Sequence, residues 1–176
     1  MHRDLLEQAI TLATIDWKGR PRQVNLRRSI SAAYYSLFHF LVDSSCRAMM
    51  GGKHEQRGYR DILARAFVHG TMFQACSSFS GGQLPIAVAK PLPKGASHQY
   101  LIVKPIQEIA RLFRELQQKR HLADYDRSER FQRSEVLTQI DEVKRLMSSF
   151  ENLPLSDDRH FFLVSLLTWK EMSGRG

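Results

Sequence analysis

The sequence predicts an all-α fold, an antiparallel up-and-down helical bundle with a four-helix core, one or two extra helices and one long irregular loop. Apolar residues recur at spacings of three and four along most of the 176 residues, which is the period of a helix with one buried face. No segment shows the alternation of apolar and polar residues that is typical of strands. Glycine and proline separate the periodic segments. We therefore predict a single helical domain over residues 1–176, with the loop at about 76–100.

The segment from about Val24 to Met50 is predicted to be the central helix, and the pair Gly51–Gly52 ends it. One face of this helix is apolar and predicts the core: Leu26, Ile30, Ala33, Tyr34, Leu37 and Leu41. A second face carries polar and aromatic side chains at the same spacing: Arg28, Ser31, Tyr35 and His39. We expect the other helices to cover the first face and the second face to take part in binding.

Two shorter helices are predicted before the loop. The first covers residues 4–17, where apolar side chains form one stripe. The other passes through the apolar positions of residues 59–67 and ends at Gly70, with His54 in a loop or at its frayed start. Within the loop, a short extended piece is expected at residues 84–89.

Three helices are predicted after the loop. Pro105 suits a first helical residue, and the apolar spacing continues from there to about His121. Asp126 and Glu129 fit a capping box for the next helix. That helix carries apolar residues at spacings of four and three, which predicts a bundle seam: Val136, Ile140, Val143, Met147 and Phe150. Ser156 and the two acidic residues after it begin a last helix, whose apolar surface predicts either central burial or an oligomer interface.

Composition limits the class of protein. The net charge of +8 favours anionic partners such as nucleic acid, nucleotides or an acidic protein. No apolar run reaches the 18 residues of a membrane span, and the first residues are too charged for a signal peptide, so we expect no membrane association. Cys46 and Cys76 are too few for a disulfide framework, which predicts free thiols in a reducing cytoplasm.

Several catalytic motifs are absent from the sequence. It contains no glycine-rich phosphate loop, no HExxH, no CxxC and no GxSxG. The seven histidines are scattered, and none is four residues from another histidine or a cysteine. We therefore predict neither a metal site nor a bound cofactor.

Three groups of side chains remain as candidate sites. The first lies on the central helix (Arg28, Tyr35 and His39), the second follows it (His54, Arg57 and Arg60), and the third lies in the segment KRHLADYD (Arg120, His121, Asp124 and Tyr125). A histidine beside arginines can contact a phosphate or exchange a proton near one. Asp124 follows Arg120 by four residues and can orient its guanidinium at a polar pocket. Each group also has a structural interpretation: a packed His39, a solvated His54, and an Arg120–Asp124 pair that pins a helix end.

Taken in order, these segments resemble the HEPN superfamily of helical proteins. The matching segments are ISAAYYSLFH at residues 30–39, KHEQRGYRDILARAFV at residues 53–68 and RHLADYD at residues 120–126. They resemble a branch that carries an AYY-aromatic-His helix, a later histidine before an apolar-spaced helix, and an Arg-x-x-Ala-Asp-Tyr motif. The resemblance covers about 100 residues.

The resemblance implies an antiparallel four-helix core and a homodimer. It also implies a setting in toxin–antitoxin pairs, stress or phage defence, where a nucleotidyltransferase-type antitoxin is one kind of partner. Many members are metal-independent endoribonucleases whose motif has four to six residues between an arginine and the histidine that follows it. This sequence departs from that motif, because His121 follows Arg120 directly and only three residues separate Arg65 from His69.

Three functional hypotheses follow. The first is a HEPN-like protein that binds RNA, a nucleotide or a protein partner without cutting. The second is a metal-independent endoribonuclease in which His39, His54 or His121 exchanges the proton and Arg120 stabilises charge on the phosphate. The third is a helical scaffold with no catalytic or nucleic-acid role.

Overall fold

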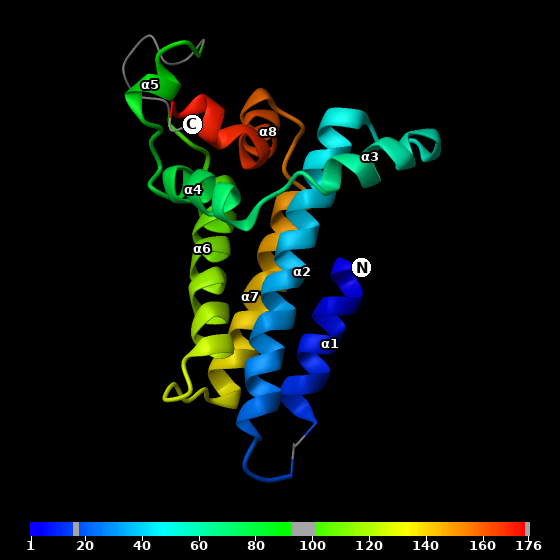
Figure 1. Ribbon diagram of the computed structural model, residues 1–176, viewed down its shortest axis with the longest axis vertical. Coiled ribbons are helices and arrows are strands. Elements are labelled where there is room, and N and C mark those ends of the chain that lie inside the picture. The colour runs from blue at the N-terminus through cyan, green and yellow to red at the C-terminus, as the bar shows by residue number, and fades with distance from the viewer. Residues whose placement is uncertain (16–17, 93–100, 175–176) are drawn as a thin grey trace. The chain divides into compact units, whose positions relative to one another are not determined.

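The computed structural model describes residues 1–15, 18–92 and 101–174 (Figure 1). These residues form eight α-helices and no β-strand, which confirms the all-α prediction. In chain order the elements are α1 (His2–Thr14), α2 (Gln23–Met50), the 3-10 helix η1 (His54–Gln56), α3 (Arg57–Ala64), α4 (His69–Ser80), α5 (Ile86–Ala89), α6 (Lys104–Tyr125), α7 (Arg133–Glu151) and α8 (Asp157–Met172).

The helices fall into two compact units. The first unit comprises Met1–Phe40 and Leu112–Glu151, and the second comprises Leu41–Arg111 and Asn152–Gly176. The long helices α2 and α6 contribute residues to both units. The single domain over residues 1–176 stays a prediction.

The first unit is an up-and-down bundle of four helical segments. In Figure 1, α1, the first part of α2, the last part of α6 and α7 run in alternating directions, and α7 packs against α1. The seam expected on α7 is confirmed, because each of its five apolar residues is buried. Aromatic rings fill the centre of this unit: Tyr34 lies 5.6 Å from Phe113, and Phe40 lies 6.1 Å from Phe150, measured between ring centroids.

The central helix has the predicted bounds to within one residue. Gly51 follows α2 with a φ of +79°, a conformation that glycine adopts without strain. All six residues of the predicted apolar stripe are buried. The second face is more mixed: Arg28 is exposed, Ser31 is buried, and Tyr35 and His39 are half-buried.

The second unit contains an aromatic cluster between α4 and α8. The ring of Phe79 lies 5.0 Å from that of Phe162 and 5.9 Å from that of Trp169, between centroids. Ser156 begins α8 as predicted, since its hydroxyl accepts a hydrogen bond from the backbone N–H of Arg159 at 3.3 Å. Phe162 and Trp169 are buried, as expected for an internal helix.

Several predicted boundaries were wrong. The helix that was predicted to end at Gly70 ends at Ala64, and Gly70 lies inside the next helix, α4. The predicted loop begins too early, since Cys76 to Ser80 belong to α4, where Cys76 and Phe79 are buried. Residues 86–89 form α5 where an extended piece was expected. In both places packing overrides a local composition of glycine, serine and proline. Residues 93–100 of the predicted loop, and Trp17 of the predicted first helix, lie outside the described residues.

The predicted capping box at Asp126 and Glu129 was also wrong. The next helix begins only at Arg133, and α6 continues past His121 to Tyr125. The Oδ1 atom of Asp126 instead accepts hydrogen bonds from the backbone N–H and the hydroxyl of Ser128, at 2.8 and 2.6 Å. These bonds hold the pKa of the Asp126 carboxyl below its usual value and fix a local turn.

Both cysteines are buried free thiols. Burial, followed by the negative charge of Asp43, raises the pKa of Cys46 to about 11. None of the helices in the described part of the chain is long and apolar enough to cross a membrane.

Candidate anion-binding site

Arg120 and Asp124 form an ion pair on one face of α6. The Nε atom of Arg120 lies 2.8 Å from Oδ2 of Asp124, and the two side chains are 25% and 22% exposed. Across the bundle, Ser31 of α2 donates its hydroxyl hydrogen to Oδ1 of Asp124 at 2.8 Å. The ion pair and Ser31 therefore engage both carboxylate oxygens, although the N–H of Arg120 Nε is not aligned for a hydrogen bond to Asp124.

Two tyrosines of α2 complete the environment of Arg120. Its Nη2 atom donates a hydrogen bond to the hydroxyl of Tyr35 at 3.0 Å. The guanidinium carbon lies 5.5 Å from the ring centroid of Tyr35 and 5.9 Å from that of Tyr34, within cation–π range. Nη1 has no hydrogen-bond partner among the residues that the structure describes. Three N–H groups of the partly exposed guanidinium, two on Nη1 and one on Nη2, thus remain available to an anion.

His39 lies one helical turn beyond Tyr35 on α2. The two rings are stacked with centroids 6.4 Å apart, and Phe38 meets His39 edge-on at 5.2 Å. Burial lowers the pKa of His39, and the positive charges of the N-terminal ammonium group and His2 lower it further. His39 is therefore a packed imidazole that favours its neutral form.

This pKa shift predicts a pH-dependent stability. The unfolded chain binds a proton on His39 at a pH near 6.5, whereas the folded chain binds it only at lower pH. Stability is therefore unaffected by this group above 6.5 and falls as the pH drops through the lowered folded pKa. We expect the urea concentration at the unfolding midpoint to fall less between neutral and acidic pH for His39→Gln than for the unmodified chain.

The matched control for that measurement is His54→Gln, which replaces an exposed histidine. It should keep the pH dependence of the unmodified chain. If His39→Gln loses urea resistance with pH as steeply as the unmodified chain does, His39 does not cause the effect.

His121 and Tyr125 form an exposed pair of rings on the last turns of α6. Their centroids are 4.9 Å apart and both residues are exposed. Because His121 directly follows Arg120, the helix turns its side chain about 100° away from that of Arg120. The pair therefore lies beside the Arg120 group on the helix surface rather than inside it.

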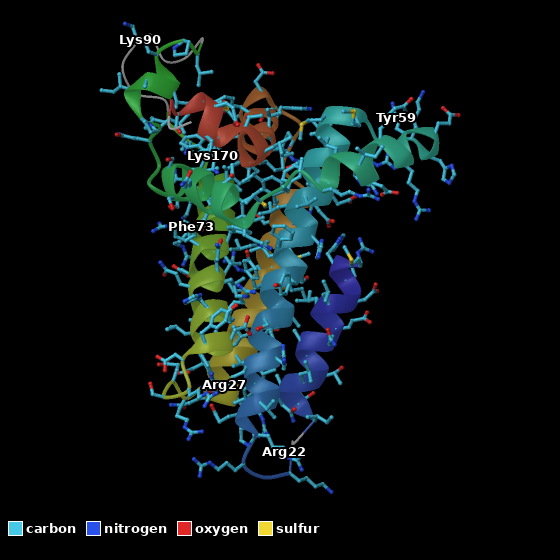
Figure 2. All side chains as sticks on the ribbon, in the orientation of Figure 1. Arg22, Arg27, Tyr59, Phe73, Lys90 and Lys170 are labelled. Carbon is cyan, nitrogen blue, oxygen red and sulfur yellow. The ribbon has the colours of Figure 1, made fainter. Side chains whose placement is uncertain are left out.

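The arginine that organises this end of α2 is Arg27, and sequence analysis missed it. Its Nη1 atom donates to the backbone oxygens of Ala123 and Asp126, each at 2.8 Å, and Nη2 donates to that of Glu129 at 2.6 Å. Figure 2 labels Arg27 on α2. The predicted binding residue Arg28 is exposed and has no hydrogen bond or ion pair with the described residues. Only the helical phase separates the two neighbours, since Arg27 lies four residues before Ser31, which faces α6.

His54, Arg57 and Arg60 belong to the second unit. His54 lies exposed in η1, and Arg57 forms an exposed ion pair with Asp61 at 3.8 Å. Arg60 donates hydrogen bonds to the backbone oxygens of Gly51 and Lys53 at 2.8 and 2.9 Å, so it stabilises the segment that follows α2.

The predicted site residues therefore fall in two units: His54, Arg57 and Arg60 lie in the second unit, and the others lie in the first. The first unit joins Tyr35, Arg120 and Asp124 through one hydrogen bond and one ion pair, and it adds the packed His39 and the ring pair His121–Tyr125. Within the described residues, no three His, Cys, Asp or Glu side chains gather as metal ligands do. The chain matches no family model, no curated protein and no solved structure.

Proposed function

We propose that this chain is a HEPN-like helical protein that binds single-stranded RNA through the first unit without cutting it. Arg120 would contact a phosphate, and His121 and Tyr125 would stack on bases. The observation that carries the proposal is the guanidinium of Arg120, which an ion pair and one hydrogen bond hold in place while three N–H groups of its Nη atoms have no partner among the described residues.

The surroundings of Arg120 favour a phosphate ligand. Arginine presents parallel N–H groups that match the oxygens of a phosphate. Asp124 and Tyr35 hold the group in one orientation, so little side-chain entropy is lost when a ligand binds. Asp124 also offsets part of the positive charge, which means that one phosphate alone would bind weakly and further contacts are required.

Exposed rings next to this cation supply such contacts. Tyr125 is 67% exposed on the last turn of α6, and His121 stands against it. Unpaired RNA bases stack on aromatic side chains, and each stacked base contributes about 1–3 kcal/mol. Double-stranded nucleic acid does not offer its base faces in this way, so single-stranded RNA is the better match.

The arrangement favours binding over cleavage. Cleavage of RNA by general acid–base catalysis needs a proton-exchanging group within hydrogen-bond reach of the reacting atoms. His121 is turned away from Arg120 on the helix, and His39 is half-buried against aromatic rings.

A homodimer, a nucleotidyltransferase-type partner and a role in toxin–antitoxin, stress or defence systems rest on the family resemblance alone.

Fluorescence anisotropy with a labelled single-stranded RNA tests the proposal. We expect saturable binding that weakens steeply as salt rises, because phosphate contacts release counterions. The same RNA, incubated with excess protein in EDTA and run on a denaturing gel, should remain intact. Absence of binding at low salt by folded protein would exclude the proposal, and cleavage in EDTA would favour the endoribonuclease hypothesis.

A further inference from the structure

Two connections of the first unit carry a concentration of exposed basic side chains. They are residues 18–22 between α1 and α2, and residues 126–132 between α6 and α7. We propose that these connections form a track that binds the phosphate backbone of single-stranded nucleic acid. The proposal rests on the proposed function, because it extends the RNA path from the end of α6.

The two connections are held together by specific contacts. Gln23 donates its Nε2 hydrogen to the backbone oxygen of Phe131 at 2.9 Å, and the backbone N–H of Phe131 donates to Oε1 of Gln23 at 3.0 Å. Arg133 reaches the backbone oxygen of Gly19 at 3.4 Å. The guanidinium of Arg27 lies 5.5 Å from the ring centroid of Phe131. The basic side chains of both connections therefore project from one fixed support.

The two connections together carry a net charge of +3, because residues 18–22 hold three basic and no acidic side chains, whereas residues 126–132 hold two arginines and two acidic residues. Residues 18–28 contain no acidic residue. Five exposed basic residues project from the two connections: Lys18, Arg20, Arg22, Arg127 and Arg130. Figure 2 labels Arg22 at the end of the α1–α2 connection. Of the acidic residues in the second connection, Asp126 is engaged by Ser128 and Glu129 is half-buried.

The neighbouring residues favour nucleic acid over an acidic protein. The second connection begins at the residue after Tyr125, whose exposed ring lies 4.9 Å from that of His121 in a tilted arrangement. A positively charged surface that continues from an aromatic stacking surface is typical of proteins that bind single strands without reading the sequence. Arginine supplies four of the five charges, and its planar fork suits phosphate.

A charge-matched pair of variants tests this track. The track variant replaces Lys18, Arg20, Arg127 and Arg130 with glutamine. The control variant makes the same change at four exposed basic residues of the second unit: Lys53, Arg65, Lys104 and Lys170. Both variants lose the same net charge. Anisotropy is measured with one labelled single-stranded RNA over a range of salt concentrations, after circular dichroism has shown that each protein is folded.

We expect the track variant to bind at least about tenfold more weakly at 0.1 M salt. The magnitude of its slope of log K against log salt should be smaller by about 2–3, since each phosphate contact on a single strand contributes about 0.7. The control variant should keep the slope. The double variants Lys18→Gln/Arg20→Gln and Arg127→Gln/Arg130→Gln should each show about half of this change in slope. They replace the fourfold variant in the experiment if that variant does not fold.

Other results would overturn the inference in distinguishable ways. Equal losses in the track and control variants would show a general charge effect. If the track variant keeps the slope of the unmodified protein while Arg120→Ala binds poorly, the track is excluded and the proposed function stands. Failure of the unmodified protein to bind RNA would remove both. Binding of polyglutamate as tightly as RNA, with the same loss in the track variant, would identify an acidic protein as the ligand.

Discussion

Replacing Arg120 with alanine is expected to weaken single-stranded RNA binding by about 10–100-fold, because a hydrogen-bonded contact to a charged group contributes about 1.5–3 kcal/mol. Arg120→Lys keeps the charge but not the planar fork, so it should restore only part of the affinity. Anisotropy at constant salt measures both effects.

The matched control is Lys119→Ala, which removes one positive charge from the adjacent, exposed position of α6. We expect it to change affinity by less than about threefold, because an exposed charge outside the contact contributes only through the screened field of the protein. Thermal melts identify any variant that binds poorly because it is unfolded. A folded Arg120→Ala protein with the affinity of the Lys119→Ala protein would contradict the assignment of Arg120.

Arg27→Ala is expected to lower the free energy of unfolding by about 2–4 kcal/mol. The substitution removes four hydrogen bonds from a guanidinium to backbone oxygens, and each such bond to a charged donor contributes about 1.5–3 kcal/mol without full additivity. It also leaves the carbonyl groups at the end of α6 and in the following connection without their donor. Urea unfolding followed by circular dichroism measures the loss.

The adjacent residue provides the control for Arg27. Arg28→Ala removes an exposed arginine from the same helix and should change the free energy of unfolding by less than about 0.5 kcal/mol. Arg27→Lys cannot span several carbonyl groups with one ammonium group and should recover only part of the stability. Equal unfolding midpoints for Arg27→Ala and Arg28→Ala would show that the arginine does not stabilise the connection.

The helical fold could be predicted because apolar spacing is a local property of the sequence. Leu26, Leu37 and Phe150 follow the helical period, and each is buried in the bundle. The errors arose where long-range packing decides the structure. Phe79 is buried against α8 despite the serines and glycines around it, which extends α4 into the predicted loop. A single sequence gives no signal for that contact.

The candidate site could be predicted only in part. The spacing of Arg120 and Asp124 indicated their ion pair, because residues four apart lie on one helix face. The hydrogen bond from Arg120 to Tyr35 depends on how α2 and α6 pack, and the sequence does not specify that register. The same limit applies to Arg27 and Arg28, since both residues are arginines and only the packing of α2 distinguishes them.

The salt dependence of RNA binding by the unmodified protein and by Arg120→Gln tests the central claim most directly. If Arg120 contacts a phosphate, the variant should lose about 0.7 from the slope of log K against log salt, in addition to its loss of affinity. Identical slopes and affinities for the two folded proteins would contradict the claim that Arg120 forms the anion-binding site.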